Sequence, residues 1–121
     1  MKEILSELYK KLETEMVTLN TNISDITFNG CIMNASGALC VTQNNLDNLN
    51  SCNSCAIVSK TSTPNLRVGN PKPRWYNNSA LSINSMGLPN LGYNFYLDYA
   101  LNSNLTKPYI MSLSGNNCIG T

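Results

Sequence analysis

The sequence predicts an α/β fold built on a parallel sheet, because three short apolar segments are separated by helical patterns. These segments span residues 31–33, 56–58 and 109–113. Each ends in small or polar residues, and short continuous apolar runs are typical of parallel strands buried on both faces. The first two begin about 25 residues apart, as one strand–helix–strand unit requires. We therefore expect three consecutive strands whose carboxyl ends meet at one edge, where such folds bind ligands.

Helices are predicted between these strands from periodicity and capping residues. Residues 2–19 place apolar side chains at a three-to-four spacing, which predicts an amphipathic helix packed on the domain, or alternatively one that binds a partner. Thr42 is the expected N-cap of a second helix that continues through Leu49. Pro89 is expected to open a third helix that continues through Tyr99.

The remaining segments set the expected domain organisation. Residues 67–81 are rich in proline, glycine and asparagine, which predicts a long loop between the second and third strands. A parallel sheet of three strands would leave unpaired edges. We therefore expect a truncated α/β domain over 20–121, preceded by a helical extension over 1–19.

Charge excludes some function classes and suggests one kind of ligand. The net charge of +1 favours no nucleic-acid partner, and no apolar run reaches the roughly 18 residues of a membrane span. No acidic residue lies between Asp47 and Asp98, whereas four basic residues do: Lys60, Arg67, Lys72 and Arg74. This local positive charge suits a small anionic ligand. The alternative is an exposed loop whose acidic partners lie elsewhere in space.

The five cysteines suggest structural thiols rather than a metal site. The N-terminus lacks the pattern of a signal peptide, and an odd number of cysteines without secretion indicates a reducing compartment. The single Cys-x-x-Cys at 52–55 has no histidine to complete a zinc site, because the chain contains none. We therefore expect buried or partly buried structural cysteines and no metal.

Four motifs carry a resemblance to a known family. They are Met-Asn-Ala-Ser-Gly at 33–37, Val-Ser-Lys-Thr-Ser-Thr at 58–63, Gly-Asn-Pro-Lys-Pro-Arg at 69–74 and Ser-Ile-Asn-Ser-Met-Gly-Leu-Pro-Asn at 82–90. In this order and spacing, the chain resembles the first third of class 1A (fumarate-type) dihydroorotate dehydrogenases over about residues 23–115. The resemblance implies a (β/α)8 TIM barrel, of which only about the first three strand–helix units are present, together with the N-terminal helix.

The resemblance also implies a function. Members of the family oxidise dihydroorotate to orotate in pyrimidine biosynthesis. The class 1A type uses FMN, passes electrons to fumarate, and works as a cytoplasmic homodimer without nucleic acid or membrane.

The same resemblance implies roles for individual residues. The expected flavin contacts are Ala35, Ser36, Gly37, Lys60 and Thr61. The expected contacts to dihydroorotate are Lys60, Asn84, Ser85, Met86, Gly87 and Leu88. A lysine at a strand end suits negative charge on the flavin or the carboxylate, and an amide can pair with the pyrimidine's amide edge. Arg74 matches a family arginine near the active-site loop.

The chain departs from the family pattern at two places. Leu81 stands where the family usually has glycine. The Asn-Leu-Ser-Cys-Pro-Asn motif that holds the family's catalytic base does not occur, so no residue here is assigned as catalytic, Cys118 included. We therefore expect this chain alone to be inactive. Alternatives are a non-catalytic remnant or small folded protein that retains the motifs, or a related flavoprotein of the class 1B or dihydropyrimidine type.

Overall fold

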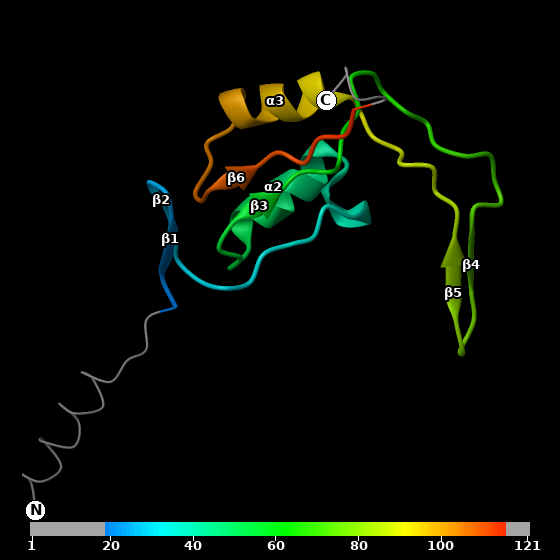
Figure 1. Ribbon diagram of the computed structural model, residues 1–121, viewed down its shortest axis with the longest axis horizontal. Coiled ribbons are helices and arrows are strands. Elements are labelled where there is room, and N and C mark those ends of the chain that lie inside the picture. Colours follow the sequence, from blue (N-terminus) through cyan, green and yellow to red (C-terminus); the bar gives the residue numbers. More distant parts are fainter. Residues whose placement is uncertain (1–18, 116–121) are drawn as a thin grey trace, which may run out of the picture.

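The protein folds around a small parallel sheet covered by two helices, with two hairpins extending from it (Figure 1). This computed structural model describes residues 19–115. The predicted helix over 2–19 lies outside the described residues, apart from Leu19 at its end. The described residues form an α/β unit without a closed barrel.

Two of the three predicted strands are confirmed as parallel neighbours. Strand β3 (Ile57–Val58) pairs with β6 (Tyr109–Ile110). The alignment continues beyond the strands, because Ser62 and Leu113 form an isolated parallel bridge. The carboxyl ends of β3 and β6 therefore reach the same edge of the sheet, as predicted.

The first predicted strand, over 31–33, does not form, so this prediction was wrong. No strand is assigned there, and the Ile32 side chain is 75% exposed. The segment still runs beside β3, because the side-chain amide of Asn34 donates to the Val58 carbonyl at 2.7 Å and accepts from its N–H at 2.9 Å. One side chain thus satisfies both backbone groups that a neighbouring strand would have paired.

Helix α2 (Gln43–Ser51) begins where its cap was predicted. The Thr42 hydroxyl accepts the N–H of Asn45 at 3.3 Å, and the Asn45 side chain accepts the N–H of Thr42 at 3.2 Å. This reciprocal capping box satisfies two donors at the helix start. A short 3-10 helix, η1 (Ala38–Cys40), precedes it.

Helix α3 (Tyr93–Asn102) begins later than predicted. Its cap residue Gly92 has a positive φ of 82°, a conformation that ends any helical path from Pro89. Buried Asn90 holds this turn, since its side-chain oxygen accepts the N–H groups of Gly92 at 2.9 Å and Thr63 at 3.2 Å. The helix can therefore start only after this anchor.

The main core lies between the helices and the sheet. Leu46 from α2, Ile57 from β3 and Tyr96 from α3 are all fully buried and belong to one cluster. Burial of a large apolar side chain contributes about 1.5–3 kcal/mol. The Tyr96 hydroxyl donates to the Val41 carbonyl at 3.0 Å, so its polar end is also satisfied. This core supports the edge of the sheet at which the strands end.

Two antiparallel hairpins were not predicted. The first pairs β1 (Thr21–Ile23) with β2 (Ile26–Phe28). The second pairs β4 (Trp75–Asn77) with β5 (Ser82–Asn84), partly within the segment expected to be a loop over 67–81. It projects away from the sheet and helices (Figure 1).

The turn of the second hairpin depends on one side chain. The Asn78 oxygen accepts the N–H groups of Ala80 and Leu81, both at 2.9 Å. Such asparagine turns let a chain reverse without a glycine pair.

No helix among the described residues is long and apolar enough to cross a membrane.

Candidate functional site

A hollow of about 720 Å³ lies between the 3-10 helix, the end of β3 and the base of the second hairpin. Its volume is within the range of about 300–1,000 Å³ that is usual for small-molecule sites. The lining residues are Gly37, Ala38, Val41, Lys60, Trp75, Asn84, Ser85, Met86, Gly87, Leu88 and Pro89. The structure thus brings Lys60 together with all five other residues expected to contact the substrate.

The five residues expected to contact flavin form one connected group. Gly37 and Lys60 line the hollow. The Ser36 hydroxyl bonds to the Thr61 hydroxyl at 2.8 Å, and the Lys60 Nζ donates to the Ser36 carbonyl at 3.3 Å. Ala35 accepts the N–H of Gly37 at 2.7 Å. Ala35, Ser36 and Thr61 therefore support the wall of the hollow without being among its lining residues.

Lys60 supplies the only charge among the residues that line this hollow. One hydrogen bond to a neutral carbonyl leaves its ammonium group with further donors. Nearby Cys40 adds no compensating negative charge at neutral pH, because burial raises the pKa of its thiol, against smaller lowering effects from Gly37 and Lys60. The hollow therefore suits an anionic ligand.

The segment Ser85–Leu88 turns its backbone in an unusual way. Gly87 has φ +73°, and Leu88 has φ +54°, which is uncommon for a residue with a side chain. Among the described residues, the N–H groups of Met86, Gly87 and Leu88 have no hydrogen-bond acceptor, and the Asn84 amide makes no hydrogen bond. Consecutive free N–H groups are a common way to bind anions.

Sequence reasoning gave no role to Trp75 or to Asn70, which lie in and beside the hollow, respectively. Trp75 lines the hollow from strand β4, and its indole N–H donates to the Ser82 hydroxyl at 3.1 Å. Asn70 contacts residues 84–88, called the substrate segment because all five were expected to contact the substrate. Its Nδ2 donates to the carbonyl and to the hydroxyl of Ser85, each at 2.9 Å. Asn70 belongs to a recognised motif, but only the fold shows which segment it touches.

Arg74, expected near the active-site loop, makes its side-chain hydrogen bonds to backbone carbonyl groups. Its Nη1 donates to the carbonyls of Val68 at 2.8 Å and Asn70 at 3.3 Å. Its own carbonyl accepts the N–H of Ser85 at 2.9 Å. Arg74 therefore joins the 69–74 motif to the start of the substrate segment.

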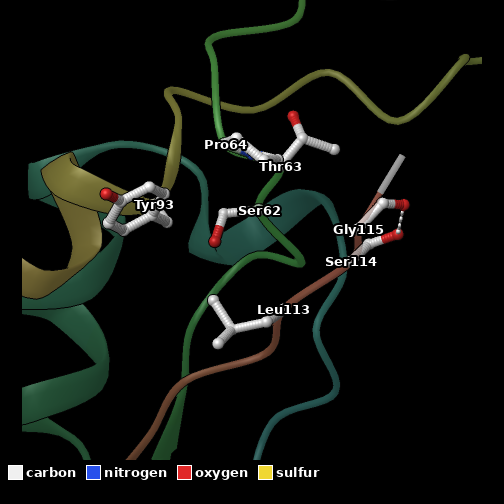
Figure 2. Close-up of a pocket in the computed structure, with 7 residues that line it drawn as sticks. All are labelled: Ser62, Thr63, Pro64, Tyr93, Leu113, Ser114 and Gly115. Carbon is white, nitrogen blue, oxygen red and sulfur yellow. Dashed lines mark hydrogen bonds between the residues drawn. The ribbon is translucent and has the colours of Figure 1, made fainter. Parts of the chain in front are cut away.

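Two other hollows lie among the described residues. One, of about 320 Å³, lies at the ends of β3 and β6, where Tyr93 from α3 and Leu113 flank Ser62 (Figure 2). None of its lining residues is charged. Another, of about 550 Å³, lies against Lys72 and Arg74 and shares Trp75 and Met86 with the Lys60 hollow. Of these three hollows, only the one lined by Lys60 draws residues from three of the four motifs, those at 33–37, 58–63 and 82–90.

The cysteines divide into two groups. Cys40 and Cys55 are buried, as expected, whereas the expectation is wrong for Cys31 and Cys52, which are exposed. Hydrogen bonding with Ser54 lowers the pKa of the Cys52 thiol. Within residues 19–115, no three histidine, cysteine or acidic side chains gather as a metal site.

Comparison with known proteins shows the family. A sequence model described as dihydroorotate dehydrogenase matches residues 18–117. The chain is 46% identical over 102 residues to a Trypanosoma cruzi (strain CL Brener) protein named dihydroorotate dehydrogenase (fumarate), covering 83% of this chain and 32% of that protein. It is 40% identical over 103 residues to a Streptococcus pyogenes serotype M5 protein assigned to dihydroorotate dehydrogenase A (fumarate), covering 83% and 33%. The chain thus spans about a third of the length of these relatives. It belongs to the dihydroorotate dehydrogenase family and matches the N-terminal portion of its class 1A, fumarate-type members.

Proposed function

We propose that the protein carrying this chain oxidises dihydroorotate to orotate, with FMN as cofactor and fumarate as electron acceptor. The observation that carries the proposal is the hollow that Lys60 lines together with residues 84–88. A single cation beside free backbone N–H groups and a free amide matches a planar, anionic pyrimidine. The names of the two relatives supply the reaction and the acceptor.

The residues beside Lys60 fit a flavin. Ala35, Ser36 and Gly37 have small side chains, and an added Cβ at Gly37 would meet only the Ala35 carbonyl, at 3.8 Å. A flat ring can therefore approach this backbone closely. The hydrogen bond between the Ser36 and Thr61 hydroxyls supports the backbone there. FMN, when bound, would accept a hydride from the substrate and pass the electrons on to fumarate.

The chain's own residues would then bind and orient the substrate. The Lys60 ammonium would stabilise negative charge on the carboxylate or on the cofactor. The Asn84 amide would pair with the amide edge of the ring, while the backbone of Ser85, Met86, Gly87 and Leu88 would enclose it. In this proposal these residues hold the substrate, and the proton is removed by a base that this sequence does not contain.

We also propose the family's larger architecture for this protein. Residues 20–121 would form the first part of a TIM barrel, with residues 1–19 as an extension, in a cytoplasmic homodimer. Exposed apolar side chains along the sheet support this, since Leu113 is 64% and Ile32 75% exposed. Such surfaces usually become covered by further structure.

The test uses the natural protein that carries this chain, expressed in its source organism and purified through an N-terminal tag. We expect flavin absorbance, and orotate formation from dihydroorotate that requires fumarate. Lys60→Gln should lower orotate formation by about a hundredfold or more, the usual effect of removing one charge-stabilising group. The matched control is Lys72→Gln, which removes a charge outside the Lys60 hollow and should leave the rate unchanged.

Three outcomes would overturn the proposal in different ways. Protein without flavin and without turnover would indicate a non-catalytic remnant. Turnover with NAD⁺ in place of fumarate would assign it to a related flavoprotein class. Equal losses in Lys60→Gln and Lys72→Gln would mean that Lys60 has no special role.

A further inference from the structure

Asn70 was given no role in the proposed function, yet it makes three hydrogen bonds to the substrate segment. Its Nδ2 donates to the Ser85 carbonyl and the Ser85 hydroxyl, each at 2.9 Å. Its backbone N–H donates to the Met86 carbonyl at 3.0 Å. Three hydrogen bonds from one residue therefore hold two consecutive residues of the segment.

The same side chain packs directly on Gly87. A Cβ placed on Gly87 would lie 2.5 Å from the Asn70 Oδ1 and 2.6 Å from its Cγ, much closer than ordinary contact. The left-handed turn at Gly87 thus forms against the Asn70 amide. The backbone N–H groups of residues 86–88 have no acceptor among the described residues.

We infer that Asn70 is a positioning residue, which orients the Ser85–Gly87 backbone and makes the Ser85 hydroxyl a donor toward the bound ligand. Nδ2 can only donate, so it occupies an acceptor site on the Ser85 oxygen. The Ser85 hydroxyl hydrogen then remains available to donate to a ligand in the hollow, which Ser85 lines. A donor at this point selects ligands that present a carbonyl or carboxylate oxygen there.

The inference rests on the proposed function for its ligand, orotate, and the decisive variant is Asn70→Asp. This change keeps the size of the side chain but replaces the donor Nδ2 with an acceptor oxygen. The new oxygen repels the Ser85 carbonyl and takes the Ser85 hydroxyl hydrogen for itself. We expect orotate to bind roughly tenfold more weakly or worse, as for one lost hydrogen bond to a charged ligand.

The control is an asparagine-to-aspartate change in the turn of the second hairpin, between β4 and β5. In Asn78→Asp the oxygen that accepts from Ala80 and Leu81 is retained, and residue 78 does not line the hollow. Orotate affinity should stay within about twofold of wild type there. Asn70→Ser, which keeps a donor but is too short to reach Ser85, repeats the test without added charge and serves if Asn70→Asp does not fold.

A double-variant cycle separates positioning from general destabilisation. If Asn70 acts through the Ser85 hydroxyl, Asn70→Asp combined with Ser85→Ala should weaken binding by less than the product of the two single effects. Independent effects that multiply would overturn the inference. So would wild-type affinity in Asn70→Asp.

Hydrogen exchange provides a readout that does not depend on the ligand. Without orotate, exchange of the Ser85 amide, whose N–H donates to the Arg74 carbonyl, should be faster in Asn70→Asp than in wild type and unchanged in Asn78→Asp. If wild-type protein binds no orotate, the proposed function fails, and the exchange rates alone then decide the inference. Equal exchange in wild type and Asn70→Asp would overturn it.

Discussion

Gly87→Ala tests whether the conformation of the substrate segment matters for binding. Gly87 has φ +73°, which costs a residue with a Cβ about 1–2 kcal/mol. The new Cβ would lie 2.5 Å from the Asn70 Oδ1 and 2.7 Å from its backbone nitrogen. Displacing the Asn70 amide would also break its two bonds to Ser85, each with a net value of about 0.5–1.5 kcal/mol.

The expected result is a large loss of affinity with a small loss of stability. A local change of at least about 2 kcal/mol corresponds to roughly thirtyfold weaker orotate binding. The segment is outside the core clusters, so it can relieve the overlap by moving, without unfolding the protein. Orotate titration followed by flavin absorbance, together with thermal unfolding, measures both quantities.

Gly37→Ala is the matched control for stability. Gly37 has φ −108°, and an added Cβ there would meet only the Ala35 carbonyl, at 3.8 Å. Stability should be unchanged or higher by up to about 1 kcal/mol, because alanine restricts the unfolded chain. Wild-type orotate affinity in Gly87→Ala would refute the assigned conformation of the segment.

Two further predictions concern the fold. Burial raises the pKa of Tyr109 to about 12, and burial with the nearby Asp47 raises that of Tyr99 to about 12, from an ordinary value of 10.0. Their contribution to stability is therefore complete below pH 10 and is lost as pH rises toward 12. Over this range the free energy of unfolding should fall with a slope approaching about 1.4 kcal/mol per pH unit for each group. Unfolding midpoints that stay constant from pH 9 to about 12 would contradict this. Asn34→Ala should lower the free energy of unfolding in urea by about 1–3 kcal/mol, because both backbone groups of Val58 lose their partner, and a loss below about 0.5 kcal/mol would show that water replaces the amide.

Local features of the fold were predictable because the interactions that create them are close in sequence. Thr42 and Asn45 are three residues apart, so their capping box is encoded in a short segment. The apolar run at Ile57 likewise identifies a buried strand. The family itself was recognisable from four motifs, and its model matches residues 18–117.

The candidate site was only partly predictable. Lys60 and Asn84 could be named from their motifs, but their shared hollow depends on a hairpin that the sequence suggested was a loop. The aromatic residues Trp75 and Tyr76 were a sequence signal for a strand, yet the prolines before them favoured irregular structure. The antiparallel pairing overrides that local preference.

Thus the family, the Thr42 cap of α2, the buried position of Ile57 and the identity of the motif residues could all be read from the sequence. Tertiary structure alone decided that Asn34 takes the place of a strand beside Val58 and that Asn70 holds Ser85. Both are hydrogen bonds between residues 24 and 15 positions apart, respectively. Such bonds form only after packing has brought the segments together, so no local pattern records them.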